Sequence, residues 1–162
     1  MTVAAVTAYI GLGANLDDPQ GTVQRAIAAL AGLPQTQLSA QSSLFRSAPV
    51  DANGDDYVNA VAQLETALSA QHLLEQLQRI EQDFGRERPY HHAPRSLDLD
   101  LLLYDNQKLH TATLTVPHPR MTQRAFTLIP LLQINPLITI PGHGPAHRLV
   151  AGVAGQVIQK IP

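Results

Sequence analysis

Hydrophobic positions along the chain follow two spacings, one that alternates at every second residue and one that recurs every three to four residues. The first is typical of a strand with one buried face, and the second of an amphipathic helix. Asp18-Pro19 and Ser69 are typical helix starts. In chain order the pattern predicts a strand at 8–13, a helix between Asp18 and Gly32, strands at 37–45 and 57–65, a helix between Ser69 and Gly85, and a strand at 95–104.

This order of elements, β-α-β-β-α-β, is the split arrangement of ferredoxin-like folds, in which both helices cover one side of the sheet. We therefore predict an α+β fold with a ferredoxin-like βαββαβ core. The residues after 104 leave room for additional C-terminal helices and a short strand, which we place at 138–140. No internal repeat and no interdomain linker interrupts the sequence, so residues 1–162 are expected to form a single domain.

The last strand of this core, RSLDLDLLLY, carries two aspartates inside an apolar run, which is unusual for a buried strand. Successive side chains of a strand point to opposite faces. One face therefore presents Ser96, Asp98, Asp100 and Leu102, and the other presents Leu97, Leu99, Leu101 and Leu103. We expect the leucine face to pack under the two helices and the aspartate face to lie on the open side of the sheet. Alternation in the strand at 57–65 places Tyr57 and Asn59 on that open side too.

Aspartates two residues apart on a strand place their Cα atoms about 6.5–7 Å apart, so their carboxylates can converge on one hard cation or on a pair of ions. Mg²⁺ suits such a site, because it takes one or two carboxylates and completes its shell with water and phosphate oxygens. The alternative is a solvated strand face that happens to carry aspartate, although aspartate is disfavoured in strands. Asp98 and Asp100 are therefore a candidate metal site.

Basic residues flank this strand on both sides in the sequence. The preceding loop carries Arg86, Arg88 and Arg95, and the segment VPHPRMTQRAF that follows carries His118, Arg120 and Arg124. Guanidinium groups bind phosphate oxygens in a bidentate manner, although any one of these arginines alone would be interpreted as a surface charge. Together, two basic segments around a dicarboxylate strand favour phosphoryl-type transfer from a nucleoside triphosphate with its metal.

Composition and charge narrow the range of partners. The chain has 162 residues, of which 44% are hydrophobic, and its net charge of −2 gives no reason to expect nucleic acid as a partner. It has no cysteine, so disulfides, thiolate zinc sites and a cysteine nucleophile are excluded. No apolar stretch is as long as a membrane-spanning helix. The first basic residue is Arg25, whereas a secretory signal needs positive charge at its start. We expect a cytoplasmic monomer that does not interact with membranes.

Other motifs have simpler explanations. The segment GLGAN at 11–15 lacks the remaining residues of a dinucleotide-binding or phosphate-binding loop, and a tight turn between strand and helix is expected there. His91 and His92 are adjacent and therefore point apart, which does not suit a zinc site. His143 and His147 lie in a loop rich in glycine and proline and are expected to be solvated.

Five segments can be compared with known families as a set. They are YIGLGANL (9–16), DYVNAV (56–61), QRIEQDFGRER (78–88), PRSLDLDLLLY (94–104) and VPHPRMTQRAF (116–126). Together they resemble the hydroxymethyldihydropterin pyrophosphokinase family of folate biosynthesis, in the family's order and over essentially the whole chain. The resemblance implies a ferredoxin-like fold and transfer of pyrophosphate from ATP to the hydroxymethyl group of 6-hydroxymethyl-7,8-dihydropterin. It also implies AMP as the other product and two Mg²⁺ ions as cofactors.

The resemblance assigns roles to residues at matching positions. It implies that the metal ions are held by Asp98 and Asp100, and that the phosphates are contacted by Arg86, Arg95, His118 and Arg124. The positions that match the nucleotide pocket are Glu81, Arg88, Leu101 and Thr115. The pterin would stack between Tyr57 and Phe126, with further contacts from Asn59, Ser47, Ala48 and Val50. The residues expected to be catalytic are Asp98, Asp100, Arg86 and Arg95.

The sequence departs from the family pattern at some positions and leaves two other functions open. Ala14 replaces a common serine, and His92 and Thr113 stand where some members have a tryptophan and a basic residue. The alternatives are a nucleotidyltransferase, which can also use Asp-x-Asp on a strand, and a ferredoxin-like module that binds a ligand without chemistry. The Gly-Ser helix start typical of nucleotidyltransferases does not precede Asp98, which counts against the first alternative.

Overall fold

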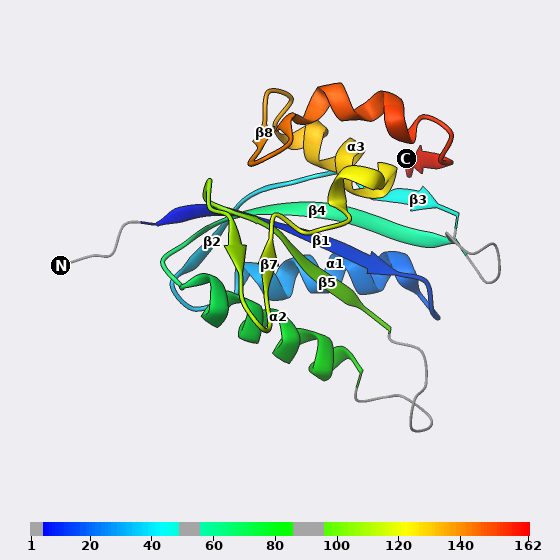
Figure 1. Ribbon diagram of the computed structural model, residues 1–162. Helices are drawn as coiled ribbons and strands as arrows, with labels where there is room; N and C mark the ends of the chain where they lie inside the picture. Colours follow the sequence, from blue (N-terminus) through cyan, green and yellow to red (C-terminus); the bar gives the residue numbers. More distant parts are fainter. Residues whose placement is uncertain (1–4, 49–55, 86–95) are drawn as a thin grey trace.

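The computed structural model describes residues 5–48, 56–85 and 96–162, and its centre is a six-stranded antiparallel sheet (Figure 1). The strands run in the order β10-β3-β4-β1-β5, with β2 also paired to β4. They are β1 (Val6–Ala14), β2 (Thr36–Gln41), β3 (Phe45–Ser47), β4 (Tyr57–Thr66), β5 (Asp98–Tyr104) and β10 (Ile158–Lys160). Because β1 pairs with both β4 and β5, the candidate functional segments lie on adjoining strands.

Two helices, α1 (Pro19–Ala31) and α2 (Ala70–Phe84), cover one face of the sheet (Figure 1). The side chains of Asp18 and Ser69 each accept a hydrogen bond from a backbone N–H of the first turn, at 3.1 Å in both cases. These are the helix starts that the sequence predicts, and the caps satisfy amides that have no partner within the helix.

The further elements after β5 are the 3₁₀ helices η1 (Met121–Gln123) and η2 (Ala146–Val153), the helix α3 (Ala125–Ile134), and the short strands β6 (Leu109–His110), β7 (Thr115–Val116), β8 (Thr139–Ile140) and β9 (Gly144–Pro145). From η1 onward, the C-terminal part of the chain covers the opposite face of the sheet (Figure 1), whereas Leu114 and Val116 of the preceding β6–β7 segment pack in the core under α1 and α2. The additional helices are thus confirmed, and the short strand expected at 138–140 is β8, which pairs with β9. Within the described ranges no helix is both long and apolar enough to cross a membrane.

The βαββαβ order of the core confirms the predicted α+β, ferredoxin-like fold, but two boundaries differ. The strand expected at 37–45 is divided into β2 and β3. The first strand, expected at 8–13, runs from Val6 to Ala14, so Gly11 and Gly13 lie inside it and do not form the tight turn expected within 11–15. Backbone pairing explains this continuation, because both glycines have partners in β4 on one side and in β5 on the other.

The leucines of β5 and of the residues just before it divide between two hydrophobic cores, one on each face of the sheet. The core under α1 and α2 contains Leu97, Leu99 and Leu101, as predicted. The core under α3 contains Leu102 and Leu103. The prediction that Leu103 shares the face of the other odd-numbered leucines is therefore wrong.

A β-bulge causes this change of face. The register between β1 and β5 shifts, because Ile10 pairs with Leu101 whereas the preceding Tyr9 pairs with Leu103. Leu102 is thus an extra residue in β5. After it, the side chains that would have faced the core under α1 and α2 face the opposite side of the sheet. The two aspartates precede the bulge and keep their shared face. Since α3 packs on that face beyond the bulge, the side of the sheet expected to be open is open only in part.

We predict that Tyr104→Phe lowers the free energy of unfolding by about 1–2 kcal/mol, because a buried carbonyl loses its hydrogen-bond partner. The Tyr104 side chain is buried and its hydroxyl donates to the Leu68 carbonyl at 2.5 Å, which ties the end of β5 to the start of α2. Burial, with a smaller contribution from Asp105, also raises the pKa of Tyr104. Urea denaturation measures the change. The control is Tyr57→Phe, because the half-buried Tyr57 makes no hydroxyl hydrogen bond within the described residues, and an equal loss there would contradict the prediction.

Candidate active site

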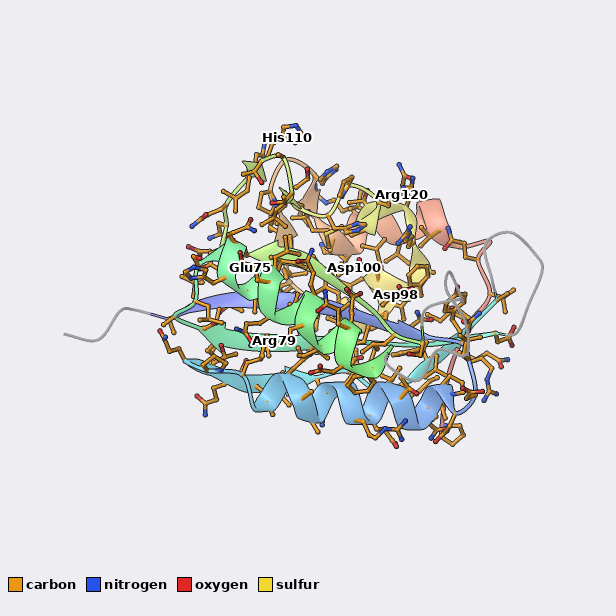
Figure 2. The ribbon with its side chains drawn as sticks, turned by 90° about the horizontal axis from the view of Figure 1, so that it is seen from below. Glu75, Arg79, Asp98, Asp100, His110 and Arg120 are labelled. Carbon is orange, nitrogen blue, oxygen red and sulfur yellow. The ribbon has the colours of Figure 1, made fainter. Side chains whose placement is uncertain are left out.

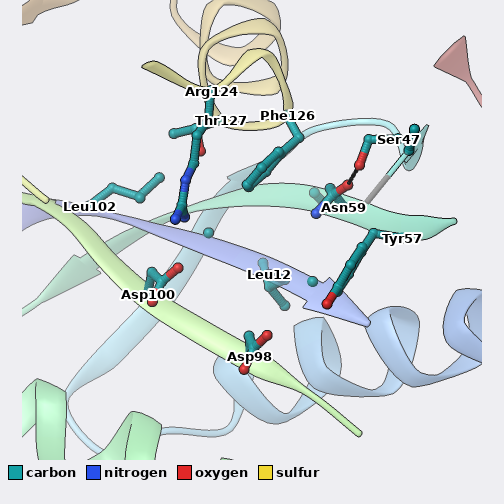
Figure 3. Close-up of a pocket in the computed structure, with 14 residues that line it drawn as sticks. Leu12, Ser47, Tyr57, Asn59, Asp98, Asp100, Leu102, Arg124, Phe126 and Thr127 are labelled. Carbon is teal, nitrogen blue, oxygen red and sulfur yellow. Dashed lines mark hydrogen bonds between the residues drawn. The ribbon is translucent and has the colours of Figure 1, made fainter. Parts of the chain in front are cut away.

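A cavity of about 310 Å³ opens on the sheet face that carries the two aspartates (Figure 3). Its volume is in the range of small-molecule sites. It is formed by β1, β4 and β5, by the end of β3 and by the start of α3, and it is lined by Gly11, Leu12, Gly13, Ser47, Ala48, Tyr57, Asn59, Ala60, Asp98, Asp100, Leu102, Arg124, Phe126 and Thr127. Segments far apart in the sequence therefore converge on one site.

The floor of the cavity is the backbone of β1. Gly13 pairs with Asp98 of β5 on one side and with Asn59 of β4 on the other, and Gly11 pairs with Asp100 in the next row. Neither glycine has a positive φ, so the backbone conformation does not require glycine. A β-carbon at Gly13 would lie 3.1 Å from Asn59 Nδ2. The missing side chains thus leave the strand backbone accessible to a ligand.

Asn59 is held in one orientation at the edge of this floor. Its side chain is only 4% exposed, and its Oδ1 accepts a hydrogen bond from Ser47 Oγ at 2.6 Å. Because the oxygen is engaged, the NH₂ group is left to face the cavity, as Figure 3 shows. A buried amide fixed in this way can donate a hydrogen bond to an acceptor on the edge of a bound ring.

Aromatic rings from two elements project into the cavity (Figure 3). Tyr57 comes from the start of β4, and Phe126 comes from the first turn of α3. The Arg124 guanidinium lies over the Phe126 ring, with Cζ 5.2 Å from the ring centroid, which is a cation–π contact. Two rings above a floor without side chains suit a planar heteroaromatic ligand.

Asp98 and Asp100 lie two residues apart on the same face of β5 (Figure 2), and both carboxylates face the cavity (Figure 3). The Arg124 side chain extends toward Asp100 from α3 (Figure 3). Across the described ranges, no cluster of three or more His, Cys, Asp or Glu side chains is placed to hold a metal ion. Two carboxylates on one strand nevertheless fit Mg²⁺, because this ion completes its shell with water and phosphate oxygens and seldom has an all-protein cage.

His118 joins the site from the segment after β7. Its Nε2 lies 3.8 Å from Asp100 Oδ1, and its Nδ1 accepts a hydrogen bond from the backbone N–H of Arg120 at 3.2 Å. Burial lowers the pKa of His118, and Arg124 and Arg120 lower it further against the opposing effect of Asp100. The imidazole is therefore neutral near pH 7, and because Nδ1 accepts a hydrogen bond, Nε2 carries the proton that faces Asp100.

Most of the predicted pterin and metal residues meet in this cavity. It brings together Asp98, Asp100, Ser47, Ala48, Tyr57, Asn59, Arg124 and Phe126. Val50, Arg86, Arg88 and Arg95 lie outside the described residues, together with His91 and His92, so their predicted roles stay predictions.

The predicted nucleotide residues Glu81, Leu101 and Thr115 do not line this cavity. A Glu81 carboxylate oxygen accepts a hydrogen bond from the backbone N–H of Leu99 at 2.8 Å, so this side chain holds β5 between the two aspartates. Leu101 is buried in the core under α1 and α2, and the half-buried Thr115 has its hydroxyl 3.1 Å from Nδ1 of His110. Their roles toward a nucleotide also stay predictions.

Sequence reasoning missed the residues that form the floor and part of the walls. The missed lining residues are Gly11, Leu12, Gly13, Ala60, Leu102 and Thr127. A signal for the two glycines was available, because residues two apart on a strand share a face. The interpretation of GLGAN as a turn concealed it.

A family model described as 7,8-dihydro-6-hydroxymethylpterin-pyrophosphokinase matches residues 9–136. The 2-amino-4-hydroxy-6-hydroxymethyldihydropteridine pyrophosphokinase of Haemophilus influenzae is 40% identical over 157 residues, which cover 96% of this chain and 98% of that protein. The protein of the same name in Pseudomonas aeruginosa is 40% identical over 155 residues, which cover 95% of this chain and 96% of that protein.

Solved structures share the fold at low sequence identity. A structure described as HPPK-DHPS in complex with substrates has a TM-score of 0.75 at 11% identity, covering 91% of this chain and 43% of that chain. Wild-type HPPK-DHPS of Plasmodium falciparum with pteroate has a TM-score of 0.73 at 11% identity, and the match covers 93% of this chain and 43% of that chain. This chain thus spans less than half of those longer chains, and the likeness supports the fold alone. On the family model and the two bacterial relatives, this chain belongs to the 7,8-dihydro-6-hydroxymethylpterin-pyrophosphokinase family.

Proposed function

We propose that this protein transfers pyrophosphate from ATP to the hydroxymethyl group of 6-hydroxymethyl-7,8-dihydropterin, which forms the pterin diphosphate and AMP in folate biosynthesis. The observation that carries the proposal is that the buried, oriented amide of Asn59 lies on one side of β1, beside Gly13, and the carboxylates of Asp98 and Asp100 lie on the other side, beside Gly13 and Gly11. Groups suited to recognise a flat polar ring and groups suited to handle phosphate thus share one cavity. Family membership supports the same reaction.

The pterin would lie on the β1 backbone with its faces against Tyr57 and Phe126. The NH₂ group of Asn59 would donate to an acceptor on the ring edge, and Ser47 would keep that amide oriented. Because Asn59 and Asp98 lie on opposite sides of Gly13, the opposite end of the ring, with its hydroxymethyl group, would point toward β5.

The triphosphate would lie over β5, where Asp98 and Asp100 would hold two Mg²⁺ ions. Bound Mg²⁺ neutralises charge on phosphate oxygens during transfer. Arg124 would add bidentate hydrogen bonds to the same oxygens, and the neutral His118 would donate from Nε2. Most of the rate acceleration would come from holding the pterin oxygen in line with the β-phosphorus and from stabilising the charge that develops in the transition state. No covalent intermediate would form on the protein.

The remaining parts of the proposal concern the whole protein. Residues 1–162 would act as a single-domain cytoplasmic monomer on two small-molecule substrates, without nucleic acid or membrane partners. A nucleotidyltransferase would instead release pyrophosphate, and a non-catalytic module would release no product. The described lining residues of the cavity do not favour either alternative over the pyrophosphokinase.

Product analysis tests the reaction. The protein would be incubated with ATP, Mg²⁺ and the hydroxymethyl dihydropterin, and the nucleotides separated by chromatography. We expect AMP and pterin diphosphate in equal amounts, formed only when the pterin is present. Formation of ADP, release of pyrophosphate, or the absence of pterin-dependent ATP consumption would overturn the proposal.

Replacing either aspartate should remove nearly all turnover. We predict that Asp98→Ala and Asp100→Ala each lower kcat by about 10³-fold at saturating Mg²⁺, because a metal ligand worth several kcal/mol of charge stabilisation is lost. Steady-state kinetics measures the effect. Asp105→Asn is the matched control at the far end of β5, where a positive φ of 53° suits asparagine. A near-normal rate for either alanine variant would contradict the assignment.

A methyl group on the cavity floor should weaken pterin binding selectively. We predict that Gly13→Ala raises the pterin Kd about tenfold or more, because its β-carbon would lie 3.1 Å from Asn59 Nδ2 and occupy the floor. The KM for ATP should stay near the wild-type value. Calorimetry with a non-hydrolysable ATP analogue and Mg²⁺ present measures the pterin Kd. Gly152→Ala, whose β-carbon would meet no atom within 4 Å, is the control, and unchanged pterin binding by Gly13→Ala would contradict the floor assignment.

A further inference from the structure

We propose that Gln156, which lies outside the segment matched by the family model, is a positioning residue that holds Arg124 and Phe126 in place in the cavity. The inference rests on the proposed function, since its consequence is pterin binding. Three observations carry it: the way α3 begins, the hydrogen bonds of the Gln156 side chain, and the pairing of the strand that follows this residue.

Helix α3 begins without a cap from its own N-cap residue. Arg124 occupies this position with an extended backbone, φ −128° and ψ 119°, and its side chain makes no capping hydrogen bond. That side chain instead extends into the cavity toward Asp100 (Figure 3). The first amides of a helix have no partner within the helix, so a cap has to come from elsewhere.

The Gln156 side chain supplies this cap from 31 residues further along the chain. Its Oε1 accepts a hydrogen bond from the backbone N–H of Ala125 at 2.8 Å, and its Nε2 donates to the backbone carbonyl of Gln123 at 2.8 Å. One amide group therefore binds the backbone on both sides of Arg124. This fixes the turn from which Arg124 and Phe126 project.

The backbone next to Gln156 is anchored to the other wall of the cavity. β10 begins after Val157 and lies beside β3, as the red strand near the C-terminus in Figure 1. Its Ile158 pairs with Ser47 of β3. Ser47 is the residue whose hydroxyl orients Asn59. The segment from Gln156 to Lys160 thus connects the wall that carries the ring-stacking Phe126 with the wall that carries the amide.

The effect of Gln156 should be on geometry more than on stability. Gln156 is exposed and is not part of either hydrophobic core, so its loss removes little buried surface. Displacement of a binding group by as little as about 1 Å can nevertheless cost about a hundredfold in rate. A merely structural residue would lower the melting temperature and leave pterin binding unchanged.

Calorimetric titration of the full-length protein with the pterin, in the presence of Mg²⁺ and a non-hydrolysable ATP analogue, tests the inference. We expect Gln156→Ala to raise the pterin Kd about tenfold, since two hydrogen bonds are lost, with a small change in melting temperature. Gln156→Glu keeps the acceptor for Ala125 but loses the donor to Gln123, and should be intermediate. Gln159→Ala is the matched control, because Gln159 is exposed on β10 and its side chain makes no hydrogen bond within the described residues.

A double-mutant cycle with Phe126→Ala shows whether Gln156 acts through that ring. If it does, Gln156→Ala should weaken pterin binding much less in the Phe126→Ala background than in the wild type. Wild-type pterin affinity in Gln156→Ala, or fully additive effects in the cycle, would overturn the inference while leaving the proposed function intact. A wild-type protein that neither binds the pterin nor forms AMP would instead overturn the proposed function, and the inference with it.

Discussion

The antiparallel register of β1 between β4 and β5 is the constraint on which the site depends. It places Asp98, Gly13 and Asn59 in one row across the sheet. Because side chains alternate along a strand, a slip of one residue in either pairing would turn a functional side chain into the core under α1 and α2. The apolar residues that alternate with these groups, such as Leu99 and Ala60, are buried in that core and oppose such a slip. Packing of one face thus specifies the chemistry of the other.

Because of the bulge at Leu102, the seven-residue strand β5 contributes both to the cavity and to a hydrophobic core on the same face of the sheet. Before the bulge, the strand presents carboxylates to a cavity on one face and leucines to a core on the other. After the bulge, Leu103 packs in the core under α3. Arg124, at the start of the helix that packs on this core, extends toward Asp100, so a positive group of the C-terminal part lies beside a negative group of the strand (Figure 3).

Features with a short-range pattern could be predicted from the sequence, and features set by tertiary contacts could not. The alternation of side chains along a strand was enough to predict that Asp98 and Asp100 share a face, and that Tyr57 and Asn59 do. The helix caps could be predicted because each depends on residues that are close in sequence. The bulge left no trace, because one extra leucine inside a run of leucines changes no pattern. The positions of His118 beside Asp100 and of Gln156 beside Ala125 depend on how distant segments pack, which no local spacing encodes.

β10 also affects how the sheet ends. Without it, β3 would present a row of unpaired N–H and C=O groups beside the cavity, and such an edge is a template for pairing with another chain. β10 covers this edge with only three residues, of which Gln159 and Lys160 are exposed. A short, charged outer strand is a poor template for further pairing. The segment from Gln156 to Lys160, which connects the two walls of the cavity, therefore also protects this edge of the sheet against edge-to-edge aggregation.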